Sequence, residues 1–566
     1  MSKAYDRVAW SHIINVLRRF GFGERFIDMV WRLISNVWFS VIINGSSYGF
    51  FKSSRGLRQG DPLSPALFII GAEVLSRALN NLVMQPRFVS FKVPYGCPSI
   101  THLAFADDVL IFANGSSFSL KAIMKVLDDY QRCSGQLLNV QKSCYLVHPS
   151  VSMARRRLLD RISRFARKSF PIRYLGFPLY IGRCKSSYFG EVCHAILARI
   201  LSWKSRLLSF GGKIILIKHV LSSIPVHLMS AAVIPSSVFK TIEKACSAFL
   251  WGSSPEESKL HWIRWPQLCY PVEEGGIGFR RLCDVYTAFS SKLWWKFRTE
   301  SSLWSTFMKA KYCKCLHPCQ VELRPTDSAI WRRMLNVSRQ VELSILWVAK
   351  YGACHFWYDN WLGSGALFLK VPVIPNLTFR NFVNNGHWDL NLLYHTLPKE
   401  IAYSISEQMV PEEGSIAEVI WMPTTTGNFS LHSAFGDIRQ TRPTSMVFAS
   451  IWHPLIPLKV SFFMLRLLLR RIPTPDKLRK FGFHLPSKCF CCTEASEESI
   501  EHLFSNGHIA SFLWNYFGGL CGIKFSGSFL RARIVDWWLY SQDSELRRLI
   551  CRILPSVICW QIWKAR

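Results

Sequence analysis

Two adjacent carboxylates, Asp107 and Asp108, stand between two apolar runs at residues 102–105 and 109–112. This pattern predicts a tight hairpin with the aspartates at a buried tip. Buried carboxylates need a cation, and Mg²⁺ or Mn²⁺ would suit because hard divalent ions prefer oxygen ligands. Two such ions about 3.5–4 Å apart can activate a 3′-hydroxyl and stabilise a leaving pyrophosphate. The alternative is a solvated Asp-Asp turn without a catalytic role.

A polar loop bracketed by glycines lies upstream of this pair and reads Arg55-Gly56-Leu57-Arg58-Gln59-Gly60-Asp61-Pro62-Leu63-Ser64-Pro65. Gly56 and Gly60 let the backbone approach a ligand closely. Arg58 and Gln59 offer donors to phosphates or base edges. The serine and prolines that end the loop predict the start of a helix. The alternative is an ordinary capped helix after a polar loop, but the specific order of these residues favours a binding loop.

The elements that must position these residues follow from apolar periodicity. The predicted elements are helices over residues 7–35, broken at Gly21 and Gly23, about 64–79 and about 119–132, and hairpins over 39–52 and 102–113. Because strands and helices do not alternate strictly, we predict an α+β fold for residues 1–185. Residues 186–310 are predicted to be mainly helical, residues 311–425 are less regular, and a last helical, basic segment is predicted over 459–488.

The chain has 566 residues, with 69 Lys and Arg against 37 Asp and Glu, so its net charge is +32. A surplus of this size favours a polyanionic partner, either nucleic acid or an acidic membrane surface. The 22 Trp and 40 Phe residues add stacking surfaces beside that charge. The hydrophobic fraction of 49% and the charged fraction of 19% exclude an extended disordered protein.

No transmembrane helix is predicted, because Glu73 and Arg77 interrupt the most apolar stretch, residues 67–79. Residues 1–10 carry charge and no apolar core, which argues against a signal peptide. Most of the 18 cysteines stand singly in apolar runs, which is typical of a reducing compartment. We therefore expect an intracellular protein.

One group of possible zinc ligands, Cys313, Cys315, His317 and Cys319, is spaced by two residues. On an extended segment, neighbours at this spacing lie roughly 6.5–7 Å apart. Ligands of one zinc ion must lie within about 4 Å of each other. We therefore expect no zinc site here.

Cys489, Cys492 and His502 form a better candidate for a zinc site. The two cysteines have the Cys-x-x-Cys spacing of a zinc knuckle, and nine residues separate the second cysteine from the histidine. This return distance is plausible for ligands of one ion.

Five motifs in order resemble the reverse transcriptases of LINE-type (non-LTR) retrotransposons, especially the plant group, over residues 1–185. They are Ser2-Lys3-Ala4-Tyr5-Asp6-Arg7-Val8, residues 56–65, Phe105-Ala106-Asp107-Asp108, Ser134-Gly135-Gln136 with Asn139 and Lys142-Ser143, and Tyr174-Leu175-Gly176-Phe177-Pro178-Leu179. The resemblance implies an RNA-directed DNA polymerase with two-metal nucleotidyl transfer. It also implies a right-hand-like palm with partial fingers, a helical thumb and connection, and a small helical zinc-binding domain.

The resemblance further implies roles for single residues. These are Asp107 and Asp108 as metal ligands, Tyr5 under the sugar of the incoming nucleotide, Arg58, Gln59 and Gly60 in the nucleotide and template pocket, Lys142 near the phosphates, and Leu175 and Gly176 in the primer grip. For Tyr5 the alternative is an aromatic side chain of the core, and for Lys142 it is a solvated lysine at a helix end.

The family's first motif begins with an aspartate, the third metal-binding carboxylate, at a position that here precedes Met1. By this resemblance, the fingers that come before this motif are also expected to be missing from residues 1–566. Asp6 is not expected to replace the aspartate, because a strand rises about 3.3 Å per residue and Asp6 stands several residues away. Loss of a stabilising group commonly lowers an enzyme's rate by about 10²–10³. We therefore expect that the chain as written does not polymerise DNA at a useful rate.

The region from Gly427 to Trp514 is similar to the zinc-binding domain that follows plant LINE-type reverse transcriptases. That domain has a fourth ligand, a cysteine five residues after the histidine. Here the position is Gly507, and His508 follows it. Either His508 replaces the cysteine or the site has three ligands.

The predicted domains are a palm with partial fingers over 1–185, a helical thumb and connection over 186–310, a connecting region over 311–425, a zinc-binding domain over 426–520 and a C-terminal tail over 521–566. The implied partners are an RNA template, a DNA primer or target DNA, and dNTPs, with Mg²⁺ or Mn²⁺ and Zn²⁺ as cofactors. We expect no membrane, and the sequence indicates no protein partner. Because template RNA and genomic DNA meet in the nucleus, we expect a nuclear protein.

Two other classes compete with the polymerase. One is a catalytically silent retroelement remnant that binds nucleic acid, and the other is an unrelated basic scaffold or membrane-surface protein. The ordered motifs argue against the scaffold. An in-frame Leu-Asp codon pair directly upstream of Met1 would favour the polymerase over the silent remnant.

Overall fold

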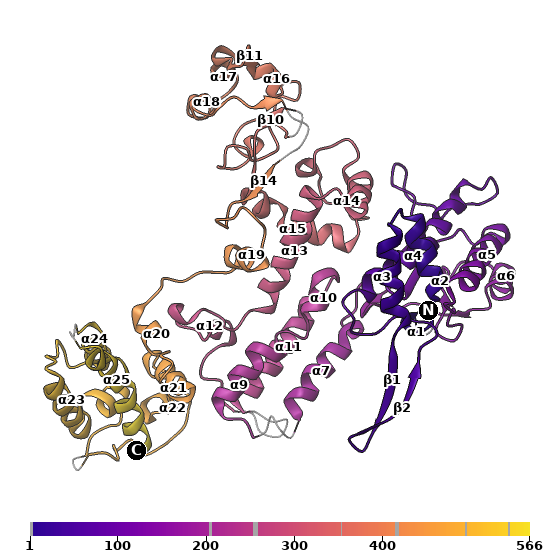
Figure 1. Cartoon of the computed structure of the whole chain (residues 1–566). Helices are drawn as coiled ribbons and strands as arrows, with labels where there is room; N and C mark the ends of the chain where they lie inside the picture. The colour runs from indigo at the N-terminus through magenta and orange to yellow at the C-terminus, as the bar shows by residue number, and fades with distance from the viewer. Residues whose placement is uncertain are drawn as a thin grey trace. The chain divides into compact units, whose positions relative to one another are not determined.

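The structure is a computed structural model, and it describes residues 4–202, 207–252, 259–351, 354–413, 418–492, 495–540 and 544–566. Ser2 and Lys3 of the first motif lie outside the described residues. The fold is mostly helical with small two-stranded sheets (Figure 1). The predicted mixture of helices and strands is therefore confirmed at this level.

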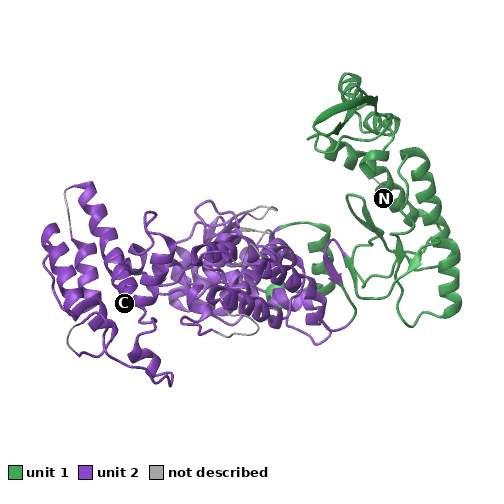
Figure 2. Cartoon of the chain, turned by 90° about the horizontal axis from the view of Figure 1, so that it is seen from below, with its two compact units in different colours: residues 1–173, 179–181, 300–321 green, residues 174–178, 182–299, 322–566 purple. Residues whose placement is uncertain are grey.

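The chain divides into two compact units (Figure 2). Unit 1 holds residues 1–173, 179–181 and 300–321, and unit 2 holds residues 174–178, 182–299 and 322–566.

Unit 1 contains the elements predicted around the motifs. Its helices and strands are α1 (Ala4–Arg7), α2 (Trp10–Arg19), α3 (Glu24–Ser35), β1 (Trp38–Ile43), β2 (Ser46–Lys52), α4 (Ser64–Asn81), η1 (Leu82–Met84), β3 (His102–Phe105), β4 (Asp108–Ile111), α5 (Ser117–Ser134), β5 (Cys144–Tyr145), α6 (Met153–Ser163), β6 (Ala166–Arg167), α14 (Leu303–Met308), η5 (Lys309–Cys313) and η6 (Pro318–Gln320). Strands β1 and β2, and β3 and β4, pair antiparallel, whereas β5 and β6 pair parallel. The predicted helix break at Gly21 and Gly23 and both predicted hairpins are confirmed.

Helix α4 connects two apolar clusters of unit 1. Its N-terminal half buries Leu67 and Phe68 against residues of α1, α2 and α3. Its C-terminal half buries Leu75 and Leu79 with residues of α5, and β4 packs against this second cluster. The helix therefore ties the loop before it to the β3–β4 hairpin.

Helix α4 and the following turn, Ser64–Met84, are also the one described segment that is long and apolar enough to cross a membrane by length and composition. A core helix can meet the same criterion, and the buried side chains of α4 belong to the two clusters of unit 1. The absence of a membrane span stays a prediction.

Unit 2 is larger and mainly helical, with six short strands among its described residues. Its main elements are η2 (Ser186–Phe189), α7 (Gly190–Leu201), α9 (Phe210–Leu216), η3 (Ile217–Leu221), α10 (Val226–Ala231), α11 (Ser236–Trp251), α12 (Trp265–Leu268), η4 (Val272–Glu274), α13 (Leu282–Thr299), α15 (Ala329–Leu343), β9 (Ile345–Trp347), β10 (Lys350–Tyr351), η7 (Leu367–Leu369), α16 (Phe379–Phe382), β11 (Val383–Asn384), β12 (His387–Trp388), α17 (Leu390–Thr396), α18 (Lys399–Ser406), β13 (Glu412–Glu413), β14 (Val419–Trp421), α19 (Leu431–Ile438), α20 (Met446–Ser450), α21 (Leu458–Leu468), α22 (Pro475–Arg479), η8 (His502–Asn506), α23 (His508–Cys521), α24 (Leu530–Leu539) and α25 (Glu545–Ala565). Strands β7 (Ile172–Tyr174) and β8 (Phe177–Leu179) lie where the chain passes between the units.

The predicted basic helix over 459–488 is shorter than expected. Helix α21 ends at Leu468, α22 ends at Arg479, and residues 480–488 form no helix. Prolines 473, 475 and 486 and a glycine with positive φ at Gly482 explain the interruption, because neither residue type continues a helix.

One core runs through unit 2. Buried residues from Phe189 to Phe289 and from Ile451 to Ile562 belong to a single cluster. At its centre the Phe210 ring stacks on Phe462 with 4.2 Å between ring centroids. Helices α7, α9 to α13, α21 and α23 to α25 therefore share one apolar cluster.

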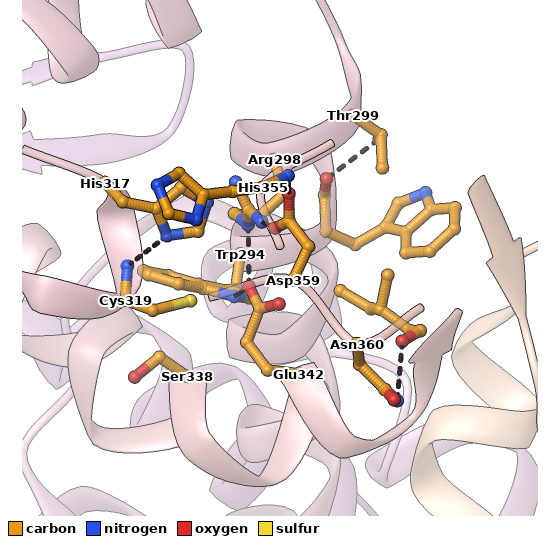
Figure 3. Close-up of polar contacts among 12 residues, drawn as sticks. Trp294, Arg298, Thr299, His317, Cys319, Ser338, Glu342, His355, Asp359 and Asn360 are labelled. Atoms are coloured by element: carbon orange, nitrogen blue, oxygen red, sulfur yellow. Dashed lines mark hydrogen bonds and ion pairs between the residues drawn. The ribbon is translucent and has the colours of Figure 1, made fainter. Parts of the chain in front are cut away.

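A buried ionic network joins α13 to α15 and to the Trp357-Tyr358-Asp359-Asn360-Trp361 segment (Figure 3). The Arg298 guanidinium donates to Glu342 Oε1 at 2.7 Å and pairs with Asp359. The indole of Trp294 donates to the same Glu342 oxygen at 2.7 Å. The guanidinium also lies 4.6 Å from the ring centroid of Trp347. This aromatic and acidic segment therefore acts structurally.

We expect Arg298→Met to lower the free energy of unfolding of unit 2 by about 3–5 kcal/mol, because it leaves two buried carboxylates without their cation. Arg479→Met is the control, since its pair with Glu497 at 3.2 Å is exposed and should contribute less than about 1 kcal/mol. Urea denaturation of both variants measures the difference. Equal stability of the two variants would contradict the role of Arg298.

Candidate functional site

The loop after β2 lies against the first motif through main-chain hydrogen bonds. Gly56 N donates to Val8 O and Leu57 N to Tyr5 O, both at 2.8 Å. The Trp10 indole donates to Gly56 O at 2.7 Å. Gly56 has φ 91°, and a Cβ there would lie 2.7 Å from Asp6 O. Only glycine therefore fits at this position.

The motif that ends α5 lies against the same segment. Ala9 N donates to Ser134 O at 2.8 Å, and Gln136 Nε2 donates to Ala4 O at 3.3 Å. Gly135 has φ 74°, and a Cβ there would lie 2.9 Å from Arg7 O. Three motifs that are remote in sequence thus form one framework.

The nucleotide-pocket residues of the prediction lie on this framework. Gln59 is exposed and donates to Asp6 Oδ1 at 3.3 Å. Arg58 is exposed and lines a cavity of about 410 Å³ between α3, β1 and the loop. Gly60 is exposed, with φ 91° and open space around it. The sequence did not predict the contact of Gln59 with Asp6. The one signal for it was that the first motif contains a carboxylate, Asp6.

Tyr5 is half-buried and stacks on Phe68 of α4, with 4.8 Å between ring centroids and 9° between ring planes. It thus contributes to the core of unit 1, as the alternative for this residue expects. Lys142 is exposed on a turn in which its N–H donates to Asn139.

The predicted primer-grip residues form the turn between β7 and β8. Leu175 and Gly176 both have positive φ, 51° and 82°. The His227 ring bonds to Leu175 O at 3.0 Å, and its Nε2 would lie 3.5 Å from a Cβ at Gly176. His227 of α10 therefore supports the turn, and no local pattern in the sequence indicates this contact.

The two aspartates lie at the tip of the β3–β4 hairpin, where Phe105 pairs with Asp108. Ala106, the residue before Asp107, has φ 50°, a conformation that carries strain in a non-glycine residue. Both aspartates are exposed, so the prediction of a buried tip is wrong. The reason is that the sheet has only two strands, and the apolar cluster covers Val109 and Ile111 but not the tip.

The carboxylate oxygens of Asp107 and Asp108 are suitable donors for a hard divalent cation. Among the described residues, however, the one group of three or more Cys, His, Asp or Glu side chains close enough to share an ion lies elsewhere, in unit 2. The pair thus fits Mg²⁺ by donor type but has no third carboxylate in such a group.

That group is the predicted zinc knuckle. The ligand atoms of Cys489, Cys492 and His502 lie within 4.8 Å of one another, and Cys492 Sγ lies 3.2 Å from His502 Nε2. Burial and the neighbouring Cys492 thiol raise the pKa of Cys489 to about 11. These three donors fit one zinc ion, which would bind the deprotonated thiols.

The structure does not bring His508 into this group. His508 is exposed at the start of α23. A Cβ on Gly507 would lie 3.4 Å from His502 Nε2 but only 2.6 Å from His502 O. Position 507 therefore points toward the ligands but has no room for a side chain unless the backbone shifts.

The cysteines at 313–319 are not extended, which corrects the geometry used to reject them. Cys313 ends η5, Lys314 has φ 53°, and η6 follows over Pro318–Gln320. His317 Nδ1 accepts a hydrogen bond from Cys319 N at 3.3 Å. The segment forms no metal-holding group among the described residues, and the absence of a zinc site here stays a prediction.

Comparisons with known proteins match two parts of the chain. A family model for reverse transcriptase (RNA-dependent DNA polymerase) matches residues 1–179. A second model, for zinc-binding in reverse transcriptase, matches residues 429–514.

Three relatives illustrate the wider similarity. The chain is 25% identical over 415 residues to a protein of Arabidopsis thaliana named as a ribonuclease H, a match that covers 69% of this chain and 65% of the relative. It is 26% identical over 284 residues to the 149 kDa protein of transposon TX1 from Xenopus laevis, covering 49% of this chain and 20% of that protein. It is 33% identical over 147 residues to the retrovirus-related Pol polyprotein of retrotransposable element R2DM from Drosophila melanogaster, covering 26% and 13%. The chain thus spans less than two thirds of each relative's length.

We expect Gly56→Ala to disrupt the framework of unit 1, because the new Cβ meets a backbone carbonyl at 2.7 Å in addition to the strain at positive φ. Gly60→Ala is the matched control, with the same φ of 91° but open space. Hydrogen exchange of residues 4–10 should be faster in Gly56→Ala, with the local free energy of opening lower than in the control by at least about 1 kcal/mol. Equal protection in both variants would argue against the close contact.

Cys492→Ser should reduce bound zinc from one ion per chain to near zero, because two ligands hold the ion weakly. Cys491→Ser is the control, since this neighbour lies outside the three-ligand group. Metal analysis after dialysis measures both, and the melting temperature should fall only in Cys492→Ser. Full zinc content in Cys492→Ser would remove the proposed site.

Proposed function

We propose that the chain is a reverse transcriptase of the non-LTR retrotransposon type with a C-terminal zinc-binding domain, and that unit 1 binds a primed RNA template and a dNTP for RNA-directed DNA synthesis. The family implies nucleic-acid substrates. The observation that carries the proposal is the framework of residues 4–10, 56–61 and 134–136, which presents Arg58 and Gln59 at an exposed surface beside a cavity.

In this proposal each residue acts through its own chemistry. Arg58 binds a phosphate of the template or nucleotide through its guanidinium. Gln59, held by Asp6 at 3.3 Å, orients its amide toward the nucleotide. Asp107 and Asp108 bind the divalent cations, which when present activate the 3′-hydroxyl and stabilise the leaving pyrophosphate. Leu175 and Gly176 position the primer end.

We further propose that residues 1–566 by themselves extend a primer very slowly. Two exposed carboxylates hold divalent ions weakly, because water competes for the ions and, among the described residues, no third ligand joins them. The alternative is a catalytically silent protein that only binds nucleic acid. It predicts the same binding of the primed template, but no divalent ion bound at Asp107.

The finer architecture is also a proposal. Residues 1–185 would form the palm with partial fingers, 186–310 the thumb and connection, 311–425 a connecting region, 426–520 the zinc-binding domain and 521–566 the tail. The motif order and the helical content of unit 2 support this assignment. We also propose a nuclear location for the protein, because template RNA and genomic DNA meet in the nucleus.

We expect the full chain to bind a primed RNA template, and Arg58→Gln to weaken this binding about tenfold, because a charge-assisted hydrogen bond to phosphate is lost. With template and dNTP bound, Mn²⁺ should bind weakly to the chain, and the enhancement of water-proton relaxation by the bound ion should be lost in Asp107→Asn. Asp128→Asn, an exposed carboxylate of α5, is the control. Fluorescence anisotropy and Mn²⁺ relaxation measure the two effects.

Primer extension completes this test. Extension with Mg²⁺ at the rate of an enzyme with a complete carboxylate set would contradict the proposed slow rate, and unchanged Mn²⁺ binding in Asp107→Asn would favour the silent binding protein. Unchanged template binding in Arg58→Gln would contradict the proposed role of the loop.

A further inference from the structure

The segment between α22 and the zinc ligands, residues 479–490, exposes three phenylalanines. The side chains of Phe481, Phe483 and Phe490 are 53%, 53% and 79% exposed. Aromatic rings of this size are usually buried or in contact with a partner. We call residues 479–490 the aromatic loop.

Positive charge surrounds these rings. Residues 477–492 contain four Lys and Arg and no Asp or Glu. Lys480 and Lys488 are exposed, and no ion pair involves either of them within the described part of the chain. Arg479 pairs with Glu497 at 3.2 Å, and this pair is exposed at both ends. The loop therefore presents aromatic faces beside two lysines, Lys480 and Lys488, that form no ion pair within the described residues.

Main-chain hydrogen bonds fix both ends of the aromatic loop. At its start, Phe483 N donates to Leu478 O at 3.2 Å and Gly482 N donates to Arg479 O at 3.0 Å. At its end, Cys489 N donates to Ser496 O at 2.9 Å. Phe490 directly follows Cys489, a member of the group of Cys489, Cys492 and His502. Its backbone is therefore positioned by its neighbour in that group. The rings are thus presented on an ordered scaffold, which reduces the entropy lost on binding.

The aromatic loop also contacts aromatic and basic side chains elsewhere in unit 2. The Phe481 ring meets Trp262 edge-on, with 6.2 Å between ring centroids. The Arg466 guanidinium lies over the same indole, 5.5 Å from its centroid. Burial lowers the pKa of Arg466 to about 10, and the group still carries its proton at neutral pH.

We propose that the aromatic loop binds single-stranded nucleic acid, with unpaired bases stacked on Phe481, Phe483 and Phe490 and backbone phosphates near Lys480 and Lys488. The proposal rests on the proposed function of the chain, since it gives the same nucleic acid a second point of attachment. Exposed rings interleaved with cations suit a single strand, because its bases are free to stack and its phosphates meet the charges. A duplex buries its base faces, and a purely apolar partner would leave the lysines unpaired.

The test uses the zinc-loaded full chain and labelled single strands of about 12 nucleotides, as RNA and as DNA, beside a duplex of the same length. Phe483→Leu and Phe490→Leu should each weaken single-strand binding about fivefold or more, because leucine keeps the apolar surface and loses the stacking face. Phe512→Leu on α23 is the matched control, with a ring 61% exposed and outside the loop. Fluorescence anisotropy measures the dissociation constants, and circular dichroism confirms that each variant is folded.

The charges are tested by salt dependence. Lys480→Gln with Lys488→Gln should lower the slope of log K against log salt by about 0.7 for each lost phosphate contact on a single strand. Lys524→Gln, an exposed lysine outside the loop, should leave the slope unchanged. Equal affinity for RNA and DNA indicates recognition of bases and phosphates, and a preference for RNA adds contacts to the 2′-hydroxyl.

Several outcomes would overturn the proposal. Phenylalanine variants that bind single strands as tightly as the unchanged chain would exclude stacking, and a stronger effect on the duplex would exclude a single-strand site. Self-association that disappears in Phe490→Leu, without any change in oligonucleotide binding, would assign the surface to a second copy of the chain. The variants of the aromatic loop could leave oligonucleotide binding unchanged while Arg58→Gln still weakens binding of the primed template. That result would reject the aromatic loop as a binding site and would leave the proposed function of unit 1 intact.

Discussion

The close approach of the backbone at Gly56 to the carbonyl of Asp6 is the constraint on which the candidate site depends. The atoms that a Cβ would meet there are backbone atoms, which cannot move aside as a flexible side chain can. Gly135 makes the same kind of approach to the carbonyl of Arg7. Because Gly56 and Gly135 have no side chains, residues 56–61 and residues 134–136 can both pack against residues 4–10. The position of Gln59 beside Asp6 follows from this packing.

In unit 2 the packing crosses the boundary predicted between residues 425 and 426. Helix α21, within the zinc-binding match, stacks Phe462 on Phe210 of α9 and Phe463 near Phe504 of η8, at 4.2 and 6.0 Å between centroids. The guanidinium of Arg439 donates two hydrogen bonds to Glu274, at 2.7 and 2.9 Å. Helix α21 therefore contacts both α9, before residue 300, and η8, which holds the candidate ligand His502.

Local pattern was enough to predict the hairpins, the break between α2 and α3, and the start of α4, because turn residues and apolar periodicity act over a few neighbours. The fate of charged groups was not predictable in this way. Arg333 was counted among the surplus cations, yet it is buried, bonds to the carbonyls of Met229 and Ala232, and stacks on Tyr286. Conversely, the aspartates expected to be buried are exposed. Burial depends on which distant elements cover a residue, and a linear pattern does not carry that information.

The group of Cys489, Cys492 and His502 and the turn after it are one structural feature. Residues His502–Asn506 form a wide helical turn, and Gly507 N closes it by donating to His502 O at 2.7 Å. That hydrogen bond brings position 507 so close to His502 that a Cβ would overlap its carbonyl oxygen at 2.6 Å. A cysteine at this position would be aimed at the metal only after the turn opened. Opening it would move Phe504, which is fully buried beside Phe463 and Trp563. Gly507 therefore has a structural role beyond the lack of a ligand side chain. It lets the turn that carries His502 close, and in the closed turn Phe504 stays buried in the core.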